Sequence, residues 1–285
     1  MNTPTWFSDA LAQTYDVGQV IVEGATIRYR VWGKPGNPVA VLVHGGAAHA
    51  GWWDHVGPHL AESHRVVALD LSGHGDSDRR EHYSLEAWAA EALAVAAAEG
   101  DERPTVFGHS MGGFVALTVA KEFGNQVKGV VAIDSPVRET SRDVRAWLES
   151  TREVPSNKVY PERDVILGRF RTLPKDDSTR DFVHDHIAEG SIIEVDGGWT
   201  WKFDPRIFFR SQMEPEEIAK APCKVALIRG ERGMATLDIT TDVAERLGGH
   251  VPVTVIRDAG HHIMLEQPIA LIAVLQTLLG QWRNV

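Results

Sequence analysis

Short runs of β-branched and other apolar residues alternate along this chain with longer stretches rich in alanine and leucine. Such runs occupy residues 39–43, 66–69, 105–107, 127–133, 225–228 and 253–256. Strands have this composition when both of their faces are buried, as in a parallel sheet covered by helices. The alternation therefore predicts an α/β fold, in which helices connect parallel strands by right-handed crossovers.

The start of the sheet and the helices are predicted from other patterns. Residues 20–23 and 26–32 flank Gly24 and Ala25, which predicts an antiparallel hairpin before the parallel strands. Apolar residues spaced as on one face of a helix predict the helices that pack on the sheet. These helical stretches are 85–98, 114–123 and 269–279.

The segment 137–222 interrupts the alternation, because it has no clean buried strand and is rich in Arg, Asp, Glu and aromatic residues. A structureless loop of this length is implausible in a compact domain. Helix-like pieces at 142–150 and 181–188 favour a mostly helical insertion. The chain is therefore predicted to have a core made of residues 1–136 and 223–285, with 137–222 inserted between core strands.

Composition excludes several classes of protein. With 285 residues, 43% of them hydrophobic, the chain can bury a large core and is not a disordered protein. The 29 basic and 39 acidic residues give a net charge of −10, which argues against a nucleic-acid partner. Cys223 is the single cysteine and is interpreted as an inert core residue, so an intrachain disulfide and a multi-cysteine metal site are excluded.

The apolar runs are too short for a membrane segment. The longest, 92–98 and 269–275, have seven residues, whereas a membrane-spanning helix needs about 20. Residues 1–17 contain two aspartates and no apolar run of signal-peptide length. We therefore expect a cytoplasmic protein without a membrane partner, while the oligomeric state stays open.

The sequence Gly108-His109-Ser110-Met111-Gly112 matches the G-x-S-x-G nucleophile elbow. Its context fits, because a predicted buried strand precedes it and a predicted helix follows. Such a turn lifts the serine hydroxyl above the sheet and points free helix N–H groups toward developing negative charge. The alternative interpretation is a glycine-rich turn with an incidental serine. We predict that Ser110 is a nucleophile.

A second glycine turn, His44-Gly45-Gly46-Ala47, directly follows the predicted strand 39–43. A backbone N–H from such a loop, together with the N–H of the residue after the nucleophile, can bind the oxyanion of a tetrahedral intermediate. Gly46 and Met111 are the predicted donors. An ordinary turn at the end of a strand is the alternative.

These motifs resemble those of the α/β-hydrolase fold family along nearly the whole chain. The resemblance includes the loop Asp70-Leu71-Ser72-Gly73-His74-Gly75-Asp76-Ser77 and Gly260-His261 followed by Glu266-Gln267-Pro268. It implies a mostly parallel sheet of about eight strands with flanking helices, and a cap over the site. Residues 137–222 lie where members of this family insert that cap.

The resemblance also indicates the general base. In similar sequences the catalytic histidine follows the glycine and lies five residues before the acidic residue of the E-Q-P motif, which points to His261. Histidine suits this role because its pKa lies near neutral pH. The neighbouring His262 is interpreted as a structural or pocket residue.

The acid of the triad departs from the common pattern of the family. Many relatives carry an aspartate where this chain has Gly233, which has no side chain. Asp134 is preferred because it ends the strand 127–133, and catalytic groups gather at the carboxyl ends of parallel strands. Glu231 and Asp238 remain as alternatives, and a turn-capping role remains open for Asp134.

The serine at the elbow favours acyl transfer, since related dehalogenases and epoxide hydrolases have an aspartate there. We therefore predict a serine hydrolase acting on a small-molecule carboxylic ester, a carboxylesterase-like enzyme. A lactonase, a carbon–carbon bond hydrolase, a perhydrolase or haloperoxidase-type enzyme and a non-catalytic ligand receptor are the alternatives. No H-E-x-x-H spacing and no G-x-G-x-x-G after a strand are present, so neither a metal nor a cofactor is predicted.

Several aromatic and small residues are candidates for a substrate pocket. They lie in or shortly after the turn His44–Ala47, beside the nucleophile, or late in the insertion. Core packing is the alternative role for the aromatic ones. The candidates are His44, Ala47, Trp52, Trp53, His109, Trp199 and Trp201.

Overall fold

The computed structural model describes residues 3–100, 103–141, 156–175 and 179–283. Eight strands form one sheet in the order β1-β2-β4-β3-β5-β6-β9-β10. All neighbours from β4 to β10 pair in parallel, and β1 and β2 add an antiparallel edge. The predicted α/β fold with a mostly parallel sheet is therefore confirmed. The strands are β1 Asp16–Val22, β2 Ala25–Trp32, β3 Val39–Val43, β4 Arg65–Leu69, β5 Thr105–His109, β6 Gly129–Ile133, β9 Lys224–Gly230 and β10 Val253–Ile256.

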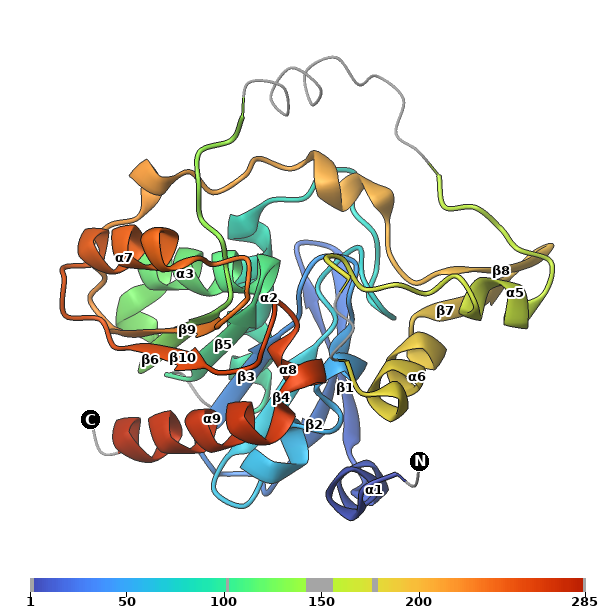
Figure 1. Ribbon diagram of the computed structural model, residues 1–285, viewed down its shortest axis with the longest axis horizontal. Coiled ribbons are helices and arrows are strands. Elements are labelled where there is room, and N and C mark those ends of the chain that lie inside the picture. Colours follow the sequence, from blue (N-terminus) through green and yellow to red (C-terminus); the bar gives the residue numbers. More distant parts are fainter. Residues whose placement is uncertain (1–2, 101–102, 142–155, 176–178, 284–285) are drawn as a thin grey trace.

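Helices cover both faces of the sheet (Figure 1), where α2, α3 and α7 lie on one side and α9 on the other. The α-helices of the core are α1 Thr5–Ala12, α2 Leu85–Ala98, α3 Met111–Phe123, α7 Leu237–Arg246, α8 Ile263–Glu266 and α9 Pro268–Trp282. Short 3₁₀ helices are η1 Ala50–Trp53, η2 Gly57–Leu60 and η3 Gly124–Gln126. This arrangement leaves the carboxyl ends of the parallel strands as one shared edge.

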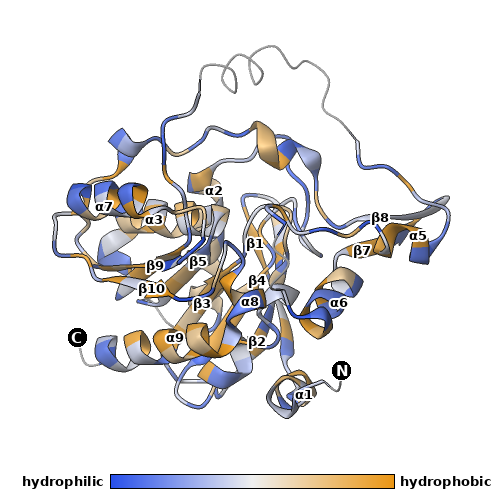
Figure 2. Cartoon of the chain, in the orientation of Figure 1, coloured by the Kyte–Doolittle hydropathy of each residue, from blue (hydrophilic) through white to orange (hydrophobic). Residues whose placement is uncertain are grey.

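The composition of the strands follows from this burial. Every residue of β3 is buried, and successive side chains point to opposite faces of a strand. Val41 packs into the core cluster under α2 and α3, whereas Leu42 packs into the cluster under α9. Figure 2 shows the hydrophobic colouring concentrated on the central strands and on the sheet-facing sides of the helices.

In the part of the segment 137–222 that the structure describes, helices are accompanied by strands, which the sequence does not predict. This part holds the helices α5 Arg163–Leu167 and α6 Asp181–Gly190, and the 3₁₀ helices η4 Pro205–Phe209 and η5 Pro215–Glu217. It also holds an antiparallel hairpin of β7 Ile192–Val195 and β8 Gly198–Trp201. The helix predicted at 181–188 is present as α6, while the piece predicted at 142–150 lies outside the described residues.

The prediction of a mostly helical insertion missed this hairpin. Its turn is made by Asp196 and Gly197, with φ +86° at Gly197 and +139° at Gly198. Asp-Gly between two β-forming runs is a strong hairpin signal. The local turn chemistry therefore outweighs the helical character of the surrounding segment.

The insertion contacts the loop that follows β4. The N–H of Gly75 donates to Lys202 O at 2.8 Å, and the N–H of Asp204 donates to Gly73 O at 2.8 Å. A side-chain hydrogen bond of 3.1 Å joins His49 Nε2 to Ser191 Oγ. These bonds hold the β7–β8 end of the insertion against the core. Within the described residues, no helix combines the length and apolarity that crossing a membrane would take.

Candidate active site

Ser110 lies at the sharp turn between β5 and α3, with φ +53° and ψ −116°. Only glycine fits at positions 108 and 112, two residues before and two residues after the serine. A Cβ on Gly108 would lie 1.9 Å from Gly112 O, and a Cβ on Gly112 would lie 2.5 Å from His44 O. The N–H of Ser110 donates to Ile133 O at 2.9 Å, which ties the turn to β6. This surrounding structure holds a strained serine in place, as is typical of functional sites.

Ser110, His261 and Asp134 form one hydrogen-bonded chain. Ser110 Oγ lies 2.9 Å from His261 Nε2, and His261 Nδ1 lies 2.6 Å from Asp134 Oδ2. Because a carboxylate only accepts, Nδ1 carries the proton and Nε2 has a lone pair that accepts from the serine hydroxyl. Asp134 is fully buried and His261 is 4% exposed. The three residues predicted from the sequence therefore meet at the carboxyl edge of the sheet.

The Asp134 carboxylate is stabilised by the backbone of the loop after β9. The N–H of Gly230 donates to its Oδ1 at 3.1 Å, and the N–H of Met234 donates to its Oδ2 at 2.8 Å. A Cβ on Gly233 would lie 2.0 Å from Oδ1. The missing side chain at Gly233 thus makes room for the carboxylate that comes from β6.

The two alternative acids do not reach the histidine. Glu231 is exposed and accepts a hydrogen bond from the N–H of Asp258 at 3.0 Å. Asp238 is exposed in the first turn of α7, where it accepts a hydrogen bond from the Thr236 hydroxyl. Neither carboxylate has a contact with His261, which leaves Asp134 as the acid in the chain.

Gly46 lies beside Met111 at the N-terminus of α3. A Cβ on Gly46 would lie 3.7 Å from Met111 Sδ and 3.9 Å from Met111 Cβ. The next residue, Ala47, has φ +57°, so the loop after β3 turns sharply at this point. The two predicted oxyanion donors are therefore neighbours at the end of the elbow.

A family model described as the alpha/beta hydrolase family matches residues 40–274. The chain belongs to the alpha/beta hydrolase family. It is 25% identical over 273 residues to an esterase of Mycobacterium tuberculosis, with 90% of this chain and 88% of that protein covered.

Two further comparisons span almost the whole hydrolase. The chain is 26% identical over 288 residues to 2-hydroxy-6-oxo-6-(2'-aminophenyl)hexa-2,4-dienoic acid hydrolase of Metapseudomonas resinovorans, covering 94% of this chain and 92% of that protein. Among solved structures, the thioesterase domain from the curacin biosynthetic pathway superposes with a TM-score of 0.77 at 22% identity, covering 92% of this chain and 99% of that domain. At 22% identity, the similarity to this thioesterase domain supports the fold alone.

The candidate pocket residues have mostly structural contacts in this hydrolase. His44 Nδ1 donates to Gly45 O at 2.7 Å, its Nε2 accepts from the N–H of Leu71 at 3.2 Å, and burial lowers its pKa to about 4. Trp53 is fully buried in the core under α9. Trp52 is nearly buried, with its ring 5.5 Å from that of His262.

The two tryptophans of the insertion pack within it. The Arg163 guanidinium lies 5.6 Å from the Trp199 ring, and the ring of Trp201 lies 6.2 Å from that of Phe170. Ala47 is half-buried beside Gly46. Phe208 belongs to the group of aromatic residues late in the insertion, for which the sequence allows either a pocket role or core packing. Its Cε1 lies 3.7 Å from a Cβ placed on Gly46, and its side chain is 48% exposed.

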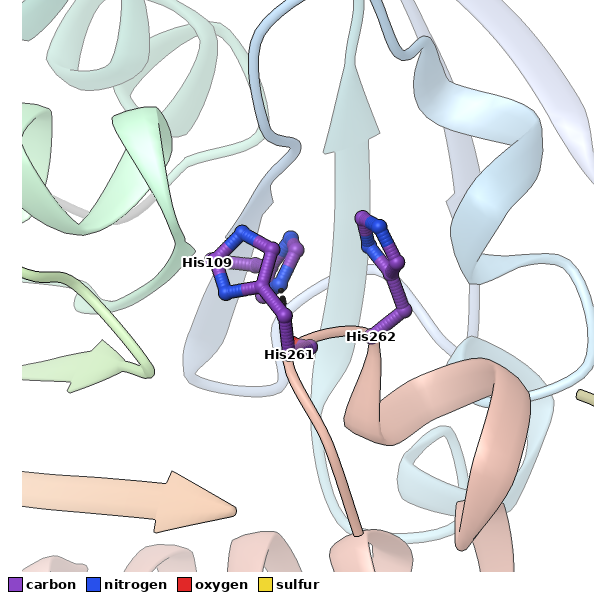
Figure 3. Close-up of side chains that lie close together, drawn as sticks. All are labelled: His109, His261 and His262. Atoms are coloured by element: carbon purple, nitrogen blue, oxygen red, sulfur yellow. Dashed lines mark hydrogen bonds between the residues drawn. The ribbon is translucent and has the colours of Figure 1, made fainter. Parts of the chain in front are cut away.

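His109 precedes the nucleophile and contacts the loop that carries the base. Its Nε2 donates to His261 O at 2.8 Å, and burial lowers its pKa well below the usual value for histidine. Figure 3 shows its ring against those of His261 and His262. Predicted as a pocket residue, His109 thus also holds the loop after β10 against the elbow.

Proposed function

We propose that this alpha/beta hydrolase is a serine esterase that cleaves a small carboxylic ester through an acyl-enzyme intermediate. The observation that carries the proposal is the hydrogen-bonded chain from Asp134 through His261 to Ser110. Serine hydroxyls are weak nucleophiles unless a neighbouring base takes their proton. The similarity to the M. tuberculosis esterase supports the same reaction type.

In the first half of the reaction, Ser110 Oγ attacks the ester carbonyl while His261 Nε2 takes its proton. Asp134 keeps the other ring proton on Nδ1 and stabilises the imidazolium that forms. His261 then gives its proton to the leaving alcohol, and the acyl group stays on Ser110. In the second half, a water molecule follows the same route and releases the carboxylic acid.

The negative charge of each tetrahedral intermediate needs donors that are already in place. In this proposal they are the backbone N–H groups of Gly46 and Met111, which are neighbours at the N-terminus of α3. Loss of one such donor typically lowers the rate about 10²- to 10³-fold. The insertion 137–222 serves as the cap, with Phe208 lying over Gly46.

Carbon–carbon bond hydrolysis is the second candidate. It is favoured by the 26% identity over most of both chains to the dienoic acid hydrolase of M. resinovorans. Both reactions would use the same serine, histidine and oxyanion donors. Only the substrate that the enzyme turns over can therefore distinguish ester hydrolysis from carbon–carbon bond hydrolysis. Assays on a nitrophenyl ester and on a vinylogous 1,5-diketone acid distinguish them.

The test combines covalent labelling with turnover. A fluorophosphonate probe is expected to label Ser110, as located by mass spectrometry of the labelled peptide. Ser110→Ala is expected to abolish labelling and to lower kcat/KM for p-nitrophenyl acetate at least about 10⁴-fold. Ser63→Ala, at a serine away from the elbow, is the matched control and should change neither. Full turnover by Ser110→Ala would disprove the proposal.

A further inference from the structure

Three buried histidines from two distant segments meet beside the nucleophile. His109 ends β5, whereas His261 and His262 follow β10. Each offers one ring nitrogen, and these nitrogens all lie within 4.8 Å of one another. Figure 3 shows the three rings side by side, and their exposed fractions are 1%, 4% and 5%. Such a cluster has the donor set of a metal site, which local sequence spacing did not reveal.

Hydrogen bonds determine which nitrogens have lone pairs. His109 Nε2 donates to His261 O, so Nδ1 carries its lone pair; this atom is buried and has no hydrogen-bond partner among the described residues. His261 Nδ1 donates to Asp134, so Nε2 carries its lone pair. Carbonyl and carboxylate partners of this kind orient the histidines that bind metals and raise their basicity.

The chemistry and spacing suit a divalent first-row transition metal. Imidazole nitrogens are ligands for Zn²⁺, Cu²⁺ and Co²⁺, and three of them leave a fourth position open. Around a tetrahedral Zn²⁺ with bonds of about 2.0–2.1 Å, ligand nitrogens lie about 3.4 Å apart. Binding of Zn²⁺ in this geometry therefore requires separations of up to 4.8 Å to shorten by up to about 1.4 Å.

We infer that His109, His261 and His262 bind a divalent transition metal ion such as Zn²⁺, and that the bound ion inhibits the enzyme. The inhibitory part rests on the proposed function, because it requires His261 as the base. The ion forms a bond to His261 Nε2, and the hydrogen bond from Ser110 to that nitrogen breaks. The serine keeps its proton, so no nucleophile forms, and a chelator reverses the change.

His262 is the residue on which the test depends, because it lies outside the proposed catalytic chain. Zn²⁺ is expected to inhibit hydrolysis of p-nitrophenyl acetate by the full-length enzyme, with activity restored by EDTA. His262→Phe keeps a ring beside Trp52, and its inhibition is measured against its own metal-free turnover. At least tenfold more Zn²⁺ is expected to be needed for its half-inhibition than for that of the unaltered enzyme. His250→Phe, at an exposed histidine, is the matched control and should leave the Zn²⁺ sensitivity unchanged.

Metal binding is measured separately from activity. Co²⁺ is expected to give a visible absorption band of tetrahedral type with the unaltered protein and with His250→Phe, and none with His262→Phe or His262→Gln. His262→Gln provides the same test if the His262→Phe protein does not fold. Equal Zn²⁺ inhibition of the unaltered protein and both His262 variants, or absence of inhibition and of the band, would overturn the inference. Co²⁺ binding without ester turnover would instead refute only the proposed esterase.

Discussion

Asp134 and Gly233 share one small volume at the edge of the sheet. The carboxylate that contacts His261 comes from the end of β6, but it occupies the space that a side chain at position 233 would enter. The φ of Gly233 is outside the left-handed region, so its backbone accepts other residues. The acid can therefore be supplied from either strand end, because catalysis depends on where the carboxylate lies and not on its place in the chain.

The first prediction moves the acid from one strand end to the other. Asp134→Ala is expected to lower kcat for p-nitrophenyl acetate at least about 10³-fold, since the histidine loses its orienting partner. Adding Gly233→Asp to that variant should recover at least about tenfold of the loss, because the new carboxylate enters the vacated volume. Glu231→Gln, at an exposed acid, serves as the control and should change kcat less than twofold. If Glu231→Gln is as damaging as Asp134→Ala, the assignment of the acid is wrong.

At the scale of elements, the short helix η4 brings the segment 137–222 against the loop after β3. Its N-cap residue Asp204 is 3% exposed, accepts from the Tyr83 hydroxyl at 2.9 Å and from the N–H of Arg206 at 3.0 Å. Four residues later, Phe208 reaches Gly46. Among the described residues of the segment, Phe208 is thus close to a predicted oxyanion donor, and we expect the buried Asp204 carboxylate to fix its position.

The second prediction concerns the proposed cap. Asp204→Ala removes an N-cap, which typically costs about 1 kcal/mol and lowers Tm by about 2–4 °C in a chain of this size. We expect KM to rise three- to tenfold and kcat to change less, as Phe208 loses its position while the Ser110–His261 contact stays intact. Steady-state kinetics and thermal unfolding measure both effects. Asp9→Ala, at an exposed aspartate of α1, is the control, and an unchanged KM in Asp204→Ala would contradict the positioning role.

At the scale of the whole molecule, the many histidines make stability depend on pH. Eight of the 13 are buried, namely His44, His49, His55, His64, His74, His109, His261 and His262. Burial lowers the pKa of His44 and His55 to about 4 and that of His49 to about 3. Between about pH 4 and 6.5 these three side chains are uncharged in the folded protein but mostly charged in the unfolded chain, so the unfolded chain binds more protons there.

The third prediction follows from the sign of these shifts. The contribution of His44, His49 and His55 to the free energy of unfolding is complete above pH 6.5 and is lost as the pH falls toward 4, at about 1.4 kcal/mol per pH unit for each group. Burial raises the pKa of Asp70 to about 6 and also raises that of Glu91, so these two carboxyls act in the opposite direction over part of the range. We expect the urea midpoint to fall steeply between pH 6.5 and 4.5, and His55→Leu to make that fall shallower. A midpoint that stays constant from pH 7.5 to 5 would contradict this account.

Much of the molecule was predictable because its signals are local. A strand buried on both faces needs a continuous apolar run, as in β3, and the elbow needs glycines on both sides of Ser110. The signal for the hairpin β7–β8 is equally local, since Asp196-Gly197 lies between two β-forming runs. The composition of the long segment around it favours helix instead, which is why the hairpin is absent from the sequence prediction.

The sequence by itself determined the mostly parallel sheet, because a strand buried on both faces needs a continuous apolar run. The bounds of the insertion and the roles of Ser110 and His261 stay predictions, which follow from residue types at short spacing and from a family resemblance. Only the tertiary structure decided which acid contacts His261 and that His109 joins the two histidines after β10. The contacting residues are 127 and 152 positions apart, and they meet because the parallel strands end at one edge of the sheet. No local pattern specifies such a distance, since it depends on how all the intervening strands pair.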